Sequence, residues 1–266
     1  MRLARVDAFE DWRRILIALV FVLPRMLVAF ALLPVFTRQS LPGMTRNGVA
    51  VSLSLVILPM VMVDAPAEPP DWLDGLAILA KEAFIGLLIG FGAAIPFWVI
   101  ASAGFFIDNQ RGTTMASSID PMTGDQSSPL GVFMSQVLAV LFFVGGGITV
   151  FLAALYESYR LWPVFSFFPR IDPAAIPWLL RLLDHFMALT VLLAAPVIIA
   201  MFLAEFALGL VSRFAPQMNV FSLAMPIKSA VGMLILVIYL GTLFGFMDDE
   251  LLAIGRHFAL LEDLFR

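Results

Sequence analysis

A polar stretch, Ile107–Pro129, holds the side chains of this chain that are best suited to chemistry: three aspartates, one arginine and two pairs of serines. Paired carboxylates can transfer protons, and a serine activated by a histidine can act as a nucleophile. Here Asp108, Asp120 and Asp125 lie in one stretch rather than on two facing helices, and no histidine is near the serines. We therefore expect no catalytic residues and no enzyme activity.

The patterns typical of metal and cofactor sites are also absent from the sequence. The two histidines, His185 and His257, are far apart, and no HExxH or GxSxG pattern is present. There is no cysteine and no block of basic residues. We expect no metal, no cofactor and no nucleic-acid partner.

The composition predicts that helices in a membrane surround this polar stretch. Hydrophobic residues make up 61% of the 266 residues and charged residues only 14%, whereas soluble proteins have about 25% charged residues. Six apolar runs approach the roughly 20 residues that span a bilayer: Ile15–Phe36, Gly48–Val63, Leu76–Ile107, Leu130–Tyr156, His185–Leu210 and Ser229–Met247. The sequence therefore predicts an all-α, multi-pass membrane protein that contacts lipid and forms one domain over residues 1–266.

Proline and glycine within these runs predict bent and closely packed helices. Proline removes a backbone donor and kinks a helix, and the prolines in question are Pro24, Pro34, Pro59, Pro96 and Pro196. Gly86 and Gly90 form a GxxxG pair, which favours close helix packing. The run Gly145–Gly147 predicts a hinge or very tight packing.

Several charged residues lie inside apolar runs, where charges usually face a protein interior, a water-filled path or another subunit. We assign six residues to buried ion pairs or subunit contacts: Arg25, Lys81, Glu82, Glu205, Arg213 and Lys228. For Lys81 and Lys228 the alternative is a helix end at the membrane surface.

The polar stretch itself is expected to be an ordered, functional loop. Long loops are usually functional or disordered. This one contains Met115, Ile119 and Met122 and has no block of like charges, which argues against a disordered linker. The residues alone thus leave two function classes, a channel or translocation component and a transporter.

Three motifs take the prediction further. The segment GFFIDNQRGTTMASSIDPMTGDQSSPLGVFMSQ, Gly104–Gln136, resembles the signature of the T-type subunit of the type III secretion export apparatus, the FliR/SctT family. Lys81–Glu82 with Gly86 and Gly90 resembles the family's KE-x3-G-x3-G segment, and Arg213–Lys228 resembles its RFxPQxNVFxxxxxxK segment. The sequence IDNQRG within this segment resembles the injectisome members of the family more than the flagellar members.

This resemblance implies an architecture and a set of partners. Members of the family are inner-membrane proteins of bacteria whose kinked helical hairpins form one subunit of a pseudo-helical export gate. The implied partners are the R-type and S-type subunits (P-type and Q-type in flagella), the U-type and V-type subunits, and secreted proteins in transit. A stand-alone secondary transporter is the alternative, but it predicts an internal repeat, and IDNQRG does not resemble RFAPQMNVF.

The resemblance also places the polar loop inside the pore, as a plug that keeps the channel closed until a substrate engages. The implied plug residues are Ile107, Asp108, Asn109, Gln110, Arg111, Gly112, Met115, Ile119, Asp120, Pro121 and Met122. Asp108 and Arg111 are expected to anchor the loop by charge-assisted hydrogen bonds, and the methionines to seal irregular gaps. The alternative is that IDNQRG only holds subunits together.

Overall fold

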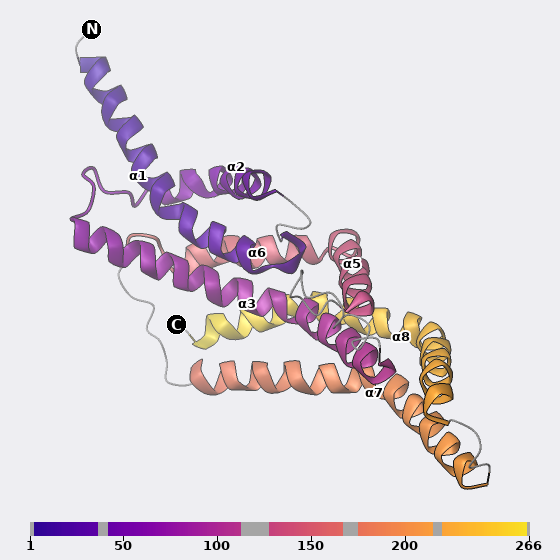
Figure 1. Cartoon of the computed structure of the whole chain (residues 1–266). Coiled ribbons are helices and arrows are strands. Elements are labelled where there is room, and N and C mark those ends of the chain that lie inside the picture. The colour runs from indigo at the N-terminus through magenta and orange to yellow at the C-terminus, as the bar shows by residue number, and fades with distance from the viewer. Residues whose placement is uncertain (1–2, 37–41, 113–127, 167–174, 215–219, 265–266) are drawn as a thin grey trace. The chain divides into compact units, whose positions relative to one another are not determined.

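The computed structural model describes residues 3–36, 42–112, 128–166, 175–214 and 220–264. Within these ranges the chain is helical and contains no strand, so the predicted all-α class is confirmed (Figure 1). The elements are α1 (Leu3–Leu32), η1 (Pro34–Phe36), α2 (Gly43–Met62), α3 (Trp72–Arg111), α5 (Pro129–Val144), α6 (Gly147–Leu161), α7 (Ala175–Phe214) and α8 (Val220–Leu264).

Five helices are long and apolar enough to cross a membrane, within the described ranges. They span Trp12–Leu32, Gly43–Met62, Trp72–Arg111, Leu180–Phe214 and Leu223–Gly255. The shorter α5 and α6 together provide a sixth candidate, broken between them. At this break Gly146 has φ +87°, a left-handed conformation that glycine adopts without strain. The chain is therefore a multi-pass membrane protein, and the run Gly145–Gly147 lies at a bend of 68° between α5 and α6.

The helices divide into two compact units. Unit 1 comprises Met1–Ala94, Gly146–Trp178 and Leu252–Arg266, and unit 2 comprises Ile95–Gly145 and Leu179–Leu251. Helix α3 contributes to both units, and it passes from one to the other next to Pro96, which lies inside the helix. The organisation of residues 1–266 as a single domain stays a prediction.

In unit 1, α3 packs with its backbone directly on α1. A Cβ atom added at Gly90 would lie 2.9 Å from the Cα of Ala29, and one added at Gly86 would overlap the carbonyl of Arg25. The close packing predicted from the GxxxG pair is thus confirmed. The ring of Phe30, on α1, lies 5.5 Å from that of Phe151, which brings α6 into the same core.

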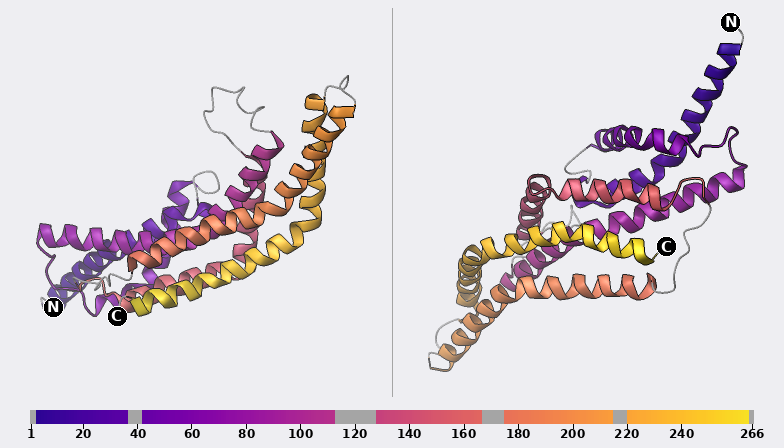
Figure 2. Two further views of the ribbon diagram at one scale, coloured as in Figure 1. Left: turned by 90° about the horizontal axis from the view of Figure 1, so that it is seen from below. Right: turned by 180° about the vertical axis from the view of Figure 1, so that it is seen from behind.

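In unit 2, α7 and α8 form an antiparallel pair, and Figure 2 shows them side by side in both views. The C-terminal part of α3 packs against α5 through two glycines. A Cβ atom added at Gly104 would lie 2.5 Å from the Cα and 2.6 Å from the N of Gly131. The rings of Phe97 and Phe142 meet edge to face at 5.4 Å and fill the same interface.

Gly104→Ala is therefore expected to lower the free energy of unfolding by about 1–3 kcal/mol, because the new methyl group meets backbone atoms that must move. Unfolding of the detergent-solubilised chain by denaturant measures this change. Gly209→Ala is the matched control: nothing lies within 4 Å of its added Cβ atom, and alanine favours a helix by up to about 1 kcal/mol over glycine. Equal destabilisation by both variants would contradict the packing described here.

Candidate functional site

Helix α3 continues into the polar stretch, which corrects the predicted boundaries of the loop. Ile107–Arg111 is helical, and the helix ends at Gly112, whose φ of +80° is typical of a helix C-terminus. At the other side Ser128 caps α5 and Pro129 is its first residue. The predicted loop of residues 107–129 is thus too long, because its two ends belong to helices. The plug residues Met115, Ile119, Asp120, Pro121 and Met122 lie outside the described residues.

The carboxylate of Asp108 joins these two helix ends. Its side chain is only 1% exposed. Oδ2 accepts hydrogen bonds from the Ser128 hydroxyl at 2.7 Å and from the Leu130 backbone N–H at 2.9 Å, and Oδ1 accepts one from Arg111 Nη1 at 3.1 Å. We call this arrangement the Asp108 clasp. A carboxylate is well placed at the start of α5, because the first N–H groups of a helix have no partner within the helix and carry partial positive charge.

The clasp extends to a third helix of unit 2 through Arg111. Its Nε donates to the hydroxyl of Ser229 on α8 at 3.1 Å. Ile107 is fully buried, whereas Asn109 is exposed and Gln110 half-buried. Of the IDNQRG residues, Ile107, Asp108 and Arg111 therefore hold the helices together, and Asn109 faces outward.

A second group of charges is buried in unit 1 around Arg25. Arg25 and Glu82 are both 0% exposed and form a bidentate pair: Nε donates to Oε2 at 2.7 Å and Nη2 to Oε1 at 2.9 Å. Arg25 also donates to the Ser158 hydroxyl at 3.0 Å and to the carbonyl of Trp162 at 2.9 Å. Its guanidinium lies 4.1 Å from the centroid of the Tyr159 ring. Four of the five N–H groups of Arg25 thus donate hydrogen bonds and both oxygens of Glu82 accept them, and such additional bonds are what a buried ion pair needs to be stable.

Lys81 connects this pair to the segment that follows α6. Its ammonium lies 3.1 Å from Glu82 and donates to the carbonyls of Pro163, Val164 and Ser166 at 3.0, 2.7 and 2.9 Å. The lysine therefore holds an irregular segment against α3. Of the two alternatives for Lys81, the structure favours a contact inside the chain.

The remaining charges lie on α7 and α8. Lys228 Nζ lies 3.0 Å from Glu205 Oε2, and Glu205 is 49% exposed. Arg213 is exposed in the last turn of α7. Glu205 and Arg213 are therefore not buried within this chain, which leaves a subunit contact as the predicted role for them.

The sequence did not reveal the polar partners of these charges. Ser128 before Pro129 matches the preference for serine at the N-cap and proline at the first helical position, so this signal was readable. Ser158 and Ser229 are single serines in apolar helices, and nothing in their spacing points to Arg25 or Arg111.

Comparison with known proteins identifies the family. Residues 16–254 match bacterial export proteins, family 1. The chain is 43% identical over 250 residues to the Yop proteins translocation protein T of Yersinia pestis, covering 94% of this chain and 95% of that protein. It is 34% identical over 211 residues to the surface presentation of antigens protein SpaR of Salmonella typhimurium, covering 79% and 78%. It is 30% identical over 229 residues to the flagellar biosynthetic protein FliR of Bacillus subtilis, covering 85% and 87%.

The length of these matches confirms the family that the three motifs predicted, and identity is higher to the two secretion proteins than to the flagellar one. The export-apparatus family also places these apolar helices in the bacterial inner membrane. The chain belongs to bacterial export proteins, family 1, as a T-type membrane subunit of the type III export apparatus.

Proposed function

We propose that this subunit is a non-catalytic part of the export gate and that the polar segment between α3 and α5 closes the channel at rest. The observation that carries the proposal is the Asp108 clasp, which joins the two helix ends that flank residues 113–127 through one buried carboxylate. A segment that shuts a protein-conducting pore must return to one position after each substrate. Ends anchored on rigid helices support such a return, because a site built on helices is held more precisely than a free loop.

The composition of the segment supports the same role. Its aspartate, serine and threonine residues make it polar enough to lie in a water-filled lumen. Met115, Ile119 and Met122 supply adaptable apolar side chains that can seal against neighbours. A secreted protein entering the pore would displace the segment while the clasp keeps its ends in place.

The exposed faces of α7 and α8 support contacts with further export subunits. Phe202, Leu203 and Phe206 on α7 are each 59% exposed, and Val237 and Ile238 on α8 are 67% and 72% exposed. Lipid or protein must cover apolar surface of this extent.

The charges among these side chains favour protein over lipid as the cover. The half-exposed Glu205–Lys228 pair lies on the same two helices, and charges at membrane depth face protein or water. The R-type and S-type subunits are the partners we assign to this surface, with U-type and V-type subunits in the same assembly. The relatives are export proteins, which gives no support to a stand-alone transporter.

Replacement of residues 115–122 by glycine and serine tests the closing role. We expect assembled complexes with this variant to conduct ions in a planar bilayer without substrate, because the seal is lost while the clasp remains. The same replacement at residues 66–69, in unit 1, is the control and should leave the resting conductance unchanged.

Two outcomes would overturn the proposal. Assembled variant complexes that stay closed would show that the segment is no plug. Low recovery of complexes, with a normal closed state in those that form, would assign the segment to holding subunits together.

A further inference from the structure

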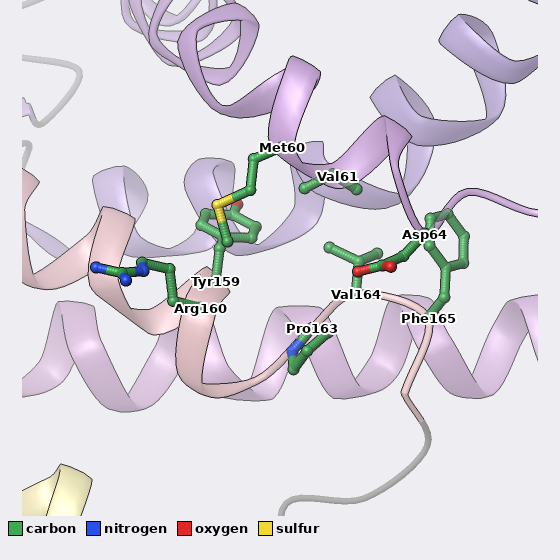
Figure 3. A pocket seen from close by; sticks show the side chains of 8 residues that line it. All are labelled: Met60, Val61, Asp64, Tyr159, Arg160, Pro163, Val164 and Phe165. Atoms are coloured by element: carbon green, nitrogen blue, oxygen red, sulfur yellow. The ribbon is translucent and has the colours of Figure 1, made fainter.

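Unit 1 contains a cavity of about 250 Å³ that neither the clasp nor the pore requires. It lies between the end of α2 and the segment that follows α6, as Figure 3 shows. Its lining residues are Met60, Val61, Asp64, Tyr159, Arg160, Pro163, Val164 and Phe165. Most of these side chains are apolar, and the two charged ones are of opposite sign.

The ends of the neighbouring membrane spans place this cavity at the surface of the bilayer. The α2 span ends at Met62, two residues before Asp64, while the α1 span begins at Trp12 and the α3 span at Trp72. Arg13 donates to the carbonyl of Ala67, which ties the start of the α1 span to the connection between α2 and α3. Trp12 and Trp72 are 66% and 72% exposed, and exposed tryptophan is enriched where lipid headgroups lie.

The Asp64 side of the cavity favours a cation. Figure 3 shows the Asp64 carboxylate directed toward Val164. Its side chain forms no hydrogen bond or ion pair within the described ranges of the chain. Helix α2 ends at Met62, two residues before Asp64, and a helix C-terminus carries partial negative charge.

The other end of the cavity favours an anion. Arg160 lies at the end opposite Asp64 (Figure 3). Its ion pair with Glu157, at 3.3 Å, is between side chains that are 68% and 48% exposed. Exposed pairs of this kind are weak, so Arg160 can exchange Glu157 for a stronger anionic partner. Arginine binds the oxygens of a phosphate group in a bidentate manner.

The wall of the cavity is held in place by the buried charges described above. Lys81 binds the carbonyls of Pro163 and Val164, and Arg25 binds that of Trp162. The Tyr159 hydroxyl donates to the carbonyl of Val22 at 2.9 Å, which fixes its ring. The site is therefore formed before a ligand arrives, and a preorganised site loses less free energy to ordering.

We propose that this cavity binds the headgroup of phosphatidylethanolamine. The primary ammonium donates to Asp64, the phosphate accepts from Arg160, and the first methylenes of the lipid lie on Met60. Two other phospholipid headgroups fit less well. The trimethylammonium of phosphatidylcholine has no N–H to donate, and the headgroup of phosphatidylglycerol has no cation. This inference does not depend on how the gate is closed.

Native mass spectrometry of the assembled export complex tests the proposal, with phosphatidylethanolamine, phosphatidylcholine and phosphatidylglycerol added in equal amounts. We expect phosphatidylethanolamine to bind about tenfold more tightly than phosphatidylcholine, the effect of one charge-assisted hydrogen bond. Asp64→Asn should remove this preference, and Arg160→Gln should weaken binding of both lipids. Glu68→Gln is the control, because Glu68 is an exposed carboxylate four residues after Asp64 that does not line the cavity.

Two results would overturn the proposal: equal binding of the three lipids, or an equal effect of Glu68→Gln and Asp64→Asn. Met60→Trp provides a second variant, since its larger ring occupies the cavity without changing a charge, and it should displace the bound lipid. A photo-reactive residue at position 165 should label lipid. Labelling of another export subunit would show instead that a protein side chain fills the cavity.

Discussion

Arg25→Met is expected to lower the free energy of unfolding of this chain by about 3–5 kcal/mol, the typical cost of removing one partner of a buried ion pair. The variant leaves Glu82 fully buried with Lys81 as its remaining charged partner, and it removes the donors to Ser158 and Trp162. Methionine keeps most of the length of arginine, so the loss is electrostatic rather than a large cavity. Denaturant titration of the detergent-solubilised chain measures the change.

The double variant Arg25→Met, Glu82→Leu separates loss of charge pairing from loss of packing. Apolar replacement of a whole buried pair is often neutral or stabilising, so this variant should recover much of the lost stability. Glu205→Gln is the second control, because its pair with Lys228 is half exposed and contributes about 0–1 kcal/mol. A single Arg25→Met variant as stable as the parent chain would contradict the arrangement described for unit 1.

Asp108→Ala is expected to release both ends of the polar segment. It removes the acceptor of the Ser128 hydroxyl and the Leu130 N–H and the counter-ion of Arg111. A hydrogen bond to a charged group contributes about 1.5–3 kcal/mol, so hydrogen exchange of the Leu130 amide should become about 10- to 100-fold faster. Mass spectrometry of a peptide that covers the start of α5 measures this rate.

Glu205→Ala provides the matched control for Asp108→Ala. It also removes a carboxylate from an apolar helix of unit 2, but from an exposed pair. It should leave exchange at the start of α5 unchanged. Slow exchange at Leu130 in the Asp108→Ala variant would show that the clasp does not hold this helix end.

The membrane class, the positions of the helices and the family were readable from the sequence, because they depend on local composition and on contiguous motifs. The bend within the run Leu130–Tyr156 was also signalled by the sequence, since three consecutive glycines are a local signal. The partner of Arg25 was not readable. Glu82 lies 57 residues away on another helix, and no periodicity within one helix relates the two positions.

The boundaries of the polar stretch were also not fully readable from the sequence, because they too depend on contacts between helices. Polarity suggested that the loop begins at Ile107, but Ile107 and Asp108 are buried against other helices, and these contacts extend α3 to Arg111. At the other end, Ser128 and Pro129 carried a helix-start signal that the polarity of the whole stretch obscured. Tertiary contacts thus decided which polar residues became helical.

The resting ion conductance of single assembled complexes in a planar bilayer tests the claim that the Asp108 clasp holds the segment that closes the export gate. Complexes that carry Asp108→Ala should conduct without substrate, while parent complexes and complexes with residues 66–69 replaced stay closed. Fully assembled Asp108→Ala complexes that remain closed, although the Leu130 amide exchanges rapidly, would contradict the claim.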